Sequence, residues 1–306
     1  MNQQNRLIAK SRQTWQDRKG RLISYVCITI IGLLVLGIIF FVASQGLTIF
    51  MKDGISLKAF FTGKVWNPTV VGADGKAQVG ALPMFVTSLI VTLLAALVAT
   101  PFALAFALLI TGIAPKRLLP ILQSVIELLV GIPSVVYGFV GLSVLVPWVR
   151  QVFGGTGSSI LTAVLVLFVM ILPTITSLSI DSLKNVPSSY RDAALALGST
   201  RWQTISKIIL RSALPGILTA IIFGMARAFG EALAVQMVIG NAPIMPAGLL
   251  SPASTLTSTL TVGIGNTVLG TLPNDALWSL ALVLLFMSLI FNALVKLIGR
   301  KGHQHA

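Results

Sequence analysis

Charged residues are scarce in this chain: they make up 10% of its 306 residues, and only eight are acidic, against 22 Lys and Arg. A hydrophobic content of 55% and a mean hydropathy of +0.93 accompany this scarcity. Such a composition excludes a soluble globular protein. The net charge of +14 therefore does not indicate binding to nucleic acid. The basic residues cluster at the ends of apolar runs, where they orient a protein in a lipid membrane.

Cysteine occurs once, at Cys27, and histidine only at His303 and His305. One thiol excludes a disulfide or a cysteine-based metal site, and Cys27, inside an apolar run, is expected to be buried. The two histidines are not expected to bind a metal, because they are isolated near the C-terminal end. No group of nucleophile, base or metal ligands indicates catalysis. No GxxxxGK[ST] phosphate loop occurs, so we expect no cofactor in this chain and nucleotide hydrolysis only by a partner.

Apolar stretches long enough to cross a hydrocarbon core of roughly 30 Å recur along the chain. Six are expected, at residues 23–50, 84–111, 119–146, 159–180, 214–240 and 278–298. The first is interpreted as an uncleaved anchor, because it is too long for a signal peptide. The sequence predicts an all-α polytopic membrane protein. Its parts are a basic segment at 1–22, a six-span domain at 23–298 and a basic tail at 299–306.

Lys and Arg are divided unequally between the two sides of these predicted spans. One side, with both termini and the segment 182–213, has 16 of them, and the other side has five. Because basic residues are enriched on the cytoplasmic side, both termini and residues 182–213 are expected in the cytoplasm.

Two charges interrupt the fifth apolar stretch, Arg227 and Glu231. Insertion scales give a cost of roughly 2.5–3.5 kcal/mol for a charge at the centre of a spanning helix. Residues four apart lie one turn apart on the same helix face, so the two side chains are predicted to meet. A guanidinium has a fork of donors that matches two phosphate oxygens, which makes Arg227 a candidate contact for an anion in transit. The alternative is a static ion pair that holds this helix to a neighbour.

Further candidates lie in the third stretch. Glu127, four residues after Gln123, either lines the same path or bonds to another helix. Ser134 and Tyr137 are candidate hydroxyl donors, with packing as the alternative role. Proline falls inside three predicted spans, at Pro101, Pro133 and Pro173. These prolines either kink helices for packing or line a pathway.

The charged segment 182–213 is predicted to form two short helices around a glycine. Ser189 is expected to cap the first helix, with Asp192 completing a capping box, and Ser199 to cap the second. The small side chains of Ala193 and Ala194 permit close approach by another surface, and Gly198 permits a sharp turn.

The spacing of Ala193, Ala194, Gly198 and Ile208 is similar to that of the cytoplasmic EAA loop of ABC importer permeases. Two further stretches, residues 131–138 and 227–241, resemble the permeases of phosphate importers, and the PstC subunit more than its PstA partner. The resemblance implies a type I ABC importer permease fold. It also implies that the loop couples to an ATPase through Tyr190, Asp192, Ala193, Ala194 and Gly198.

The same resemblance implies the partners. These are a second permease of the PstA type, two cytoplasmic ATPase subunits that bind ATP and magnesium, and a periplasmic phosphate-binding protein. The chain is then a subunit in a bacterial inner membrane that carries inorganic phosphate inward and is not itself an enzyme. The alternatives are another oxyanion, such as sulfate or molybdate, or an ion-driven secondary transporter that works alone. A lone transporter would have no use for a loop that docks an ATPase.

Overall fold

The computed structural model describes residues 12–71, 77–115 and 117–303. The chain divides into two compact units, residues 1–45 and 46–306. Six helices among the described residues are long and apolar enough to cross a membrane, which confirms the predicted number. They lie at Asp17–Met51, Leu82–Ile113, Ser134–Phe153, Ile160–Lys184, Arg201–Phe229 and Leu272–Ile298.

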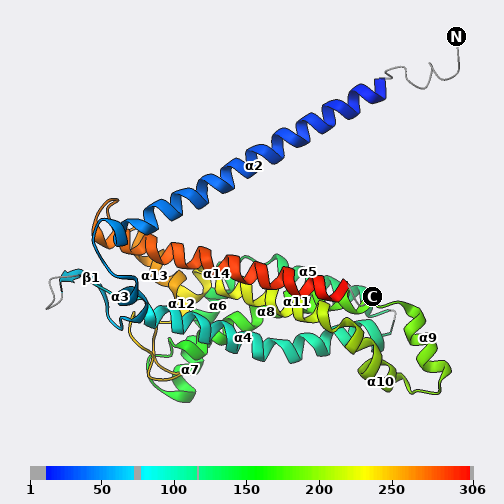
Figure 1. Ribbon diagram of the computed structural model, residues 1–306. Helices are drawn as coiled ribbons and strands as arrows, with labels where there is room; N and C mark the ends of the chain where they lie inside the picture. The colour runs from blue at the N-terminus through cyan, green and yellow to red at the C-terminus, as the bar shows by residue number, and fades with distance from the viewer. Residues whose placement is uncertain (1–11, 72–76, 116, 304–306) are drawn as a thin grey trace, which may run out of the picture. The chain divides into compact units, whose positions relative to one another are not determined.

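In the first unit the described residues belong to one helix, α2 (Arg12–Met51), drawn in dark blue in Figure 1. Its large apolar side chains from Leu22 to Phe40 are exposed, because no other described element of this unit packs against them. Cys27 is exposed as well, so the expectation of a buried thiol is wrong. The helix also begins inside the predicted basic segment 1–22, of which residues 1–11 lie outside the described part.

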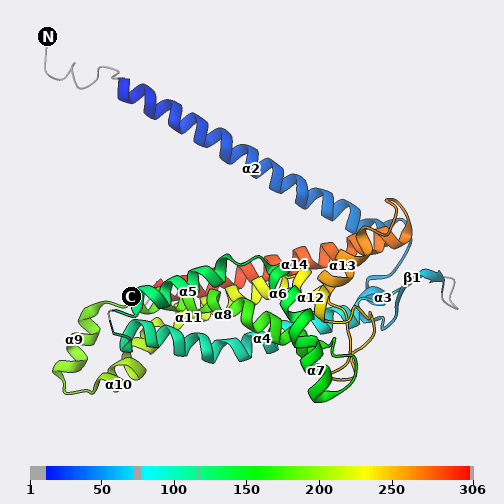
Figure 2. The same cartoon turned by 180° about the vertical axis from the view of Figure 1, so that it is seen from behind.

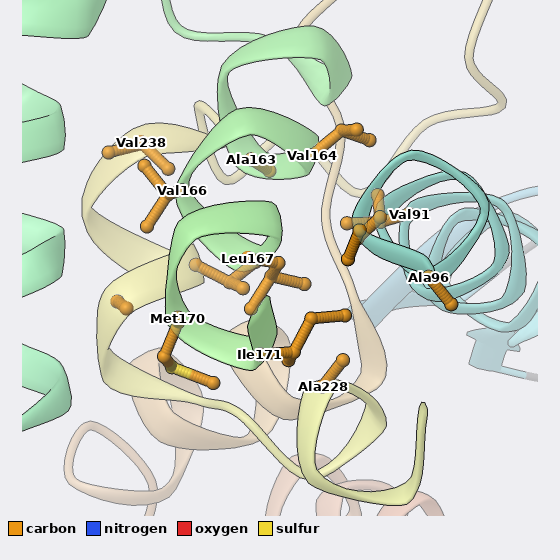
Figure 3. Packing of buried hydrophobic residues seen from close by; sticks show 14 of the residues in the cluster. Val91, Ala96, Ala163, Val164, Val166, Leu167, Met170, Ile171, Ala228 and Val238 are labelled. Carbon is orange, nitrogen blue, oxygen red and sulfur yellow. The ribbon is translucent and has the colours of Figure 1, made fainter. Parts of the chain in front are cut away.

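The second unit is built around α8 (Ile160–Lys184), which packs along α4 (Leu82–Leu108) and α11 (Leu210–Phe229). Figure 3 shows the centre of this packing, with Leu167 and Ile171 of α8 in a buried apolar cluster. Because α8 is covered on several sides, its apolar residues continue around the helix instead of forming one stripe.

Small residues allow α11 to approach α8 closely. They recur every fourth position and so share one helix face, at Gly216, Ala220, Gly224 and Ala228. A Cβ added at Gly216 would lie 2.5 Å from Ser182 Oγ, and one at Gly224 would lie 2.6 Å from Ile175 Cγ1. Both contacts are too short, so only glycine fits at these two positions with the helices as they stand. This type of close approach is characteristic of helix packing in membranes.

The third predicted span is wrong in its position. Residues 119–146 contain α5 (Leu119–Gly131), a break at Ile132 and Pro133, and α6 (Ser134–Val140). The segment long enough to cross a membrane is Ser134–Phe153, which continues through the π-helical turn η2 (Gly141–Leu145) into α7 (Val146–Phe153). Ile132 has an extended backbone, as expected before proline, and this ends α5.

The fifth predicted span, 214–240, overlaps the observed apolar helix Arg201–Phe229 only in part, and residues 214–240 do not form one helix. α11 ends at Phe229, and a short helix, α12 (Leu233–Val238), follows after residues 230–232. The chain then returns through α13 (Leu256–Ile264) to the last helix, α14 (Leu272–His303). The Leu256 backbone N–H, at the start of α13, donates to Ser88 Oγ of α4 at 2.9 Å, which attaches this returning segment to the bundle.

Between α2 and α4 the chain forms a short helix and a pair of strands. α3 (Leu57–Thr62) precedes two antiparallel strands, β1 (Trp66–Val71) and β2 (Ala77–Val79), with Trp66 opposite Val79. Phe60 of α3 is completely buried in a second apolar cluster, which explains why the segment is ordered.

The charged segment lies at one end of the helical bundle. It contains α9 (Ser188–Ala196), α10 (Arg201–Gln203) and the π-helical turn η3 (Thr204–Ile209). Figures 1 and 2 agree that α9 and α10 lie at the end of this unit opposite to α3 and β1. The C-terminal end of α14 lies at the same end as α9. The two segments predicted to share the cytoplasmic side are therefore on one side of the bundle.

Candidate functional site

Arg227 is half-buried in the last turn of α11. Its Nη1 donates a hydrogen bond to the hydroxyl of Thr174, which lies on α8 and is 7% exposed. A cation in an apolar helix is costly unless polar groups or an anion surround it, so this bond supplies only part of what the guanidinium needs.

Glu231 lies beyond the end of α11 and has other partners. Its Oε1 accepts a hydrogen bond from the Ala234 backbone N–H at 3.1 Å, and thus caps the start of α12. Its backbone carbonyl accepts from Thr257 Oγ1 of α13 at 2.8 Å. Glu231 therefore joins α12 and α13 at the interruption of the fifth span.

The predicted meeting of Arg227 and Glu231 does not occur in this structure. The prediction assumed a continuous helix, and the helix ends between the two residues. No ion pair joins these two side chains. Lys52 and Asp275 form an ion pair elsewhere in the second unit, at 3.9 Å.

Tyr137 of α6 packs against the apolar cluster that includes Ala228, the neighbour of Arg227 in α11. The hydroxyl is not free, because it donates to the Leu129 carbonyl of α5 at 2.8 Å. In a continuous helix that carbonyl would accept from residue 133, which is proline and has no N–H. Tyr137 thus satisfies the carbonyl that Pro133 leaves without a donor. Ser134 is half-buried in the first turn of α6.

The other polar pair predicted in the third stretch lies on α5. Glu127 is exposed and Gln123 is half-buried. No hydrogen bond or ion pair within the described residues joins Glu127 to Arg227 or Glu231. The structure therefore does not join Glu127 to the residues around Arg227.

Sequence reasoning missed Thr174 and several buried polar groups around these helices. Buried oxygen atoms without a hydrogen-bond partner occur on Thr87, Ser179, Gln236 and Thr259. Thr174 follows Pro173 in a long apolar run. A hydroxyl in such a run was the one sequence feature that could have indicated a polar partner for Arg227. Many hydroxyls in membrane helices only donate to a backbone carbonyl of their own helix, as Thr176 does. A threonine in an apolar run is therefore weak evidence for a functional role.

The predicted caps of the charged hairpin are wrong, although its two helices and glycine are confirmed. Pro187 is the N-cap of α9, and Ser189 lies inside the helix. Thr200 caps α10, with Gln203 completing a capping box. Ser199 instead donates its hydroxyl to the Ala194 carbonyl at 2.6 Å.

Gly198 makes the turn between α9 and α10. Its φ of +81° is unfavourable for other residues, and it places the Gly198 N–H on Leu195 O and the Ser199 N–H on Ala194 O. This pair of bonds is the Schellman arrangement that ends many helices. The hairpin therefore has a defined shape before any partner binds.

The two alanines of the hairpin differ in exposure. Ala193 is exposed, as are Tyr190 and Asp192, whereas Ala194 is buried. Ala194 thus belongs to the interior of the hairpin, which corrects the expectation that both alanines form a docking surface. Large apolar side chains are exposed beside Ala193, at Tyr190, Leu195, Leu197 and Trp202. Exposed apolar groups of this size are typical of surfaces that bind another protein.

His305 lies outside the described residues, and the side chain of His303 is not described either. The prediction for the two histidines therefore stays a prediction. The same applies to residues 304–306 of the predicted basic tail.

Comparison with known proteins gives a consistent result. Residues 104–302 match the sequence model of the family described as binding-protein-dependent transport system inner membrane component. The chain is 47% identical over 304 residues to the probable ABC transporter permease protein YqgH of Bacillus subtilis (strain 168), covering 98% of this chain and 97% of that protein. It is 31% identical over 258 residues to the phosphate transport system permease protein PstC of Mesorhizobium japonicum, covering 78% and 77% of the two chains.

Solved structures show the same fold at low sequence identity. A chain of the MetNI methionine ABC transporter in an inward-facing conformation superposes with a TM-score of 0.55 at 20% identity, covering 71% of this chain and 93% of that one. A chain of a bacterial ABC transporter that imports the acidic polysaccharide alginate gives a TM-score of 0.59 at 15% identity, covering 96% and 99%. The architecture is thus that of type I ABC importer permeases.

Proposed function

Because this chain belongs to the family of inner membrane components of binding-protein-dependent transport systems, we propose that it carries inorganic phosphate into the cytoplasm as one permease of an ATP-driven importer. The family and the six apolar helices make it a multi-pass inner membrane protein of the ABC importer permease class. Phosphate as the cargo is our own inference. It is supported by relatives whose names specify phosphate transport.

The observation that carries this proposal is the half-buried guanidinium of Arg227 in a membrane-spanning helix. A dianionic or monoanionic tetrahedral oxyanion supplies both the opposite charge and the acceptors that a guanidinium lacks in an apolar segment. No carboxylate within the described residues forms an ion pair with Arg227, so an anion in transit meets no competing acid on this side chain.

The energy for transport comes from partners in this proposal. The family works with ATPase subunits and binding proteins, and a solved alginate importer that shares the fold is in complex with its periplasmic protein. We assign the hairpin with Tyr190, Asp192, Ala193 and Gly198 to contact with the ATPase, because these residues are exposed and large apolar side chains are exposed beside them. The second permease of the complex is then a PstA-type chain, and the hairpin and both termini lie in the cytoplasm.

The test is uptake by the purified importer complex in proteoliposomes, with its binding protein and ATP. The account predicts ATP-dependent accumulation of radiolabelled phosphate that excess sulfate or molybdate does not reduce. Uptake that sulfate or molybdate suppresses at equal concentration would assign the chain to another oxyanion. Uptake that proceeds without ATP and with an ion gradient alone would contradict the ATP-driven class.

A further inference from the structure

We propose that Thr174 is a positioning residue for the transported anion, because its hydroxyl orients the guanidinium of Arg227 so that the two-donor edge of the guanidinium faces the substrate. This inference rests on the proposed function and assigns a specific role to a second helix. It makes α8, and not only α11, part of the anion site.

The geometry of the guanidinium carries the first step. Arginine has five N–H donors in a fixed plane, and Thr174 accepts from Nη1 alone. Nε and Nη2, which form the edge that binds two oxygens of one anion, have no acceptor within the described residues. A single bond at Nη1 therefore restricts rotation of the plane and leaves the bidentate edge available.

The burial of the partner carries the second step. Thr174 is 7% exposed and lies between Pro173 and Ile175, both of which are buried. A buried side chain on a packed helix has little rotational freedom, whereas a long arginine side chain has a great deal. The hydrogen bond consequently restrains the flexible guanidinium at a fixed place beside α8.

Close packing of the two helices carries the third step. Gly224, one turn before Arg227, leaves no space for a Cβ against Ile175, the neighbour of Thr174. This contact sets the separation of α8 and α11 beside the hydrogen bond. The bond between Thr174 and Arg227 thus depends on a backbone approach that only glycine permits.

The absence of an acidic partner carries the last step. Glu231 accepts a hydrogen bond from the Ala234 N–H through Oε1 and forms no ion pair with Arg227. A guanidinium neutralised by a carboxylate would bind an anion weakly, whereas one held by a neutral hydroxyl keeps its full charge. Threonine is therefore a suitable residue to orient this cation without neutralising it.

The test compares Thr174→Val with Thr174→Ser in the reconstituted importer with saturating phosphate-loaded binding protein. Loss of a hydrogen bond to a charged group corresponds to roughly a tenfold or larger effect, so Thr174→Val is expected to reduce phosphate uptake at least tenfold. Thr174→Ser keeps the hydroxyl and is expected to stay within about threefold of the wild type. Thr174→Ala gives the same comparison without the branched side chain of valine beside Ile175.

The decisive readout is phosphate taken up per ATP hydrolysed, because a merely structural defect would lower both activities together. We expect this ratio to fall in Thr174→Val and Thr174→Ala while ATP hydrolysis continues. Thr176→Val is the matched control, since Thr176 is also buried on α8 but bonds only to the Leu172 carbonyl of its own helix. An unchanged ratio in Thr174→Val and Thr174→Ala would overturn the inference.

Arg227→Gln separates failure of this inference from failure of the proposed function. If Arg227→Gln abolishes uptake and the Thr174 variants are normal, Arg227 serves transport and Thr174 does not position it. If Arg227→Gln itself transports phosphate normally, the anion site proposed above is wrong, whatever the Thr174 variants do.

Discussion

Pro133 leaves the Leu129 carbonyl without a helical donor, and the Tyr137 hydroxyl takes that place at 2.8 Å. The same side chain packs against the apolar cluster that includes Ala228, the neighbour of Arg227. One side chain therefore satisfies the backbone at a break in the third span and packs against the last turn of α11 through the apolar cluster. At the level of single residues, a side chain beside the candidate site thus also has a structural role, as a hydrogen-bond donor to the backbone.

The bond of Tyr137 leads to a prediction about stability. Tyr137→Phe leaves the Leu129 carbonyl without a hydrogen-bond donor in a mostly apolar region. This loss lowers the free energy of unfolding by about 1–3 kcal/mol. We expect a lower unfolding temperature of the purified complex. Tyr25→Phe is the control, because Tyr25 is 69% exposed on α2 and this change should have little effect. Equal unfolding temperatures for Tyr137→Phe and the wild type would show that the bond does not contribute.

Elements differ in how far the sequence predicts them. The six apolar stretches follow from composition, because a spanning helix needs a long apolar run whatever its neighbours are. The interruptions do not follow, since Pro101 and Pro173 lie inside continuous helices whereas Pro133 begins a new one. Whether proline bends or ends a membrane helix depends on which neighbours satisfy the freed carbonyl, and those neighbours come from the tertiary structure.

The contact between α8 and α11 gives a prediction at this scale. Gly224→Ala puts a Cβ about 2.6 Å from Ile175 Cγ1, and overpacking of this kind costs about 1–3 kcal/mol. We expect the variant to have a lower unfolding temperature and reduced phosphate uptake, because the helices must separate beside Arg227 and Thr174.

Gly32→Ala is the matched control for this variant. Gly32 lies in α2, and a Cβ there would meet nothing within 4 Å. Alanine also has a higher helix propensity than glycine, so the control should be neutral or slightly stabilising. Normal uptake and normal stability of Gly224→Ala would contradict the role of this close approach.

At the scale of the whole molecule, a helical bundle holds the half-buried side chain of Arg227, and an exposed hairpin lies at one end of this bundle. The membrane class and the importer resemblance were predictable, because they depend on local sequence, whereas the role of Arg227 stays a prediction. The partner of Arg227 was not predictable: spacing indicated Glu231, four residues away, whereas the structure pairs Arg227 with Thr174, 53 residues away. An interruption at residues 230–232 separates the local pair, and helix packing creates the distant one.

The central claim is that Arg227 contacts the transported phosphate, while the hairpin binds the ATPase whose ATP hydrolysis drives transport. It is tested most directly by Arg227→Gln in the reconstituted importer, with phosphate uptake and ATP hydrolysis measured in the same vesicles. The account predicts an assembled complex that still hydrolyses ATP and takes up little or no phosphate. Phosphate uptake at the wild-type rate by Arg227→Gln would contradict it.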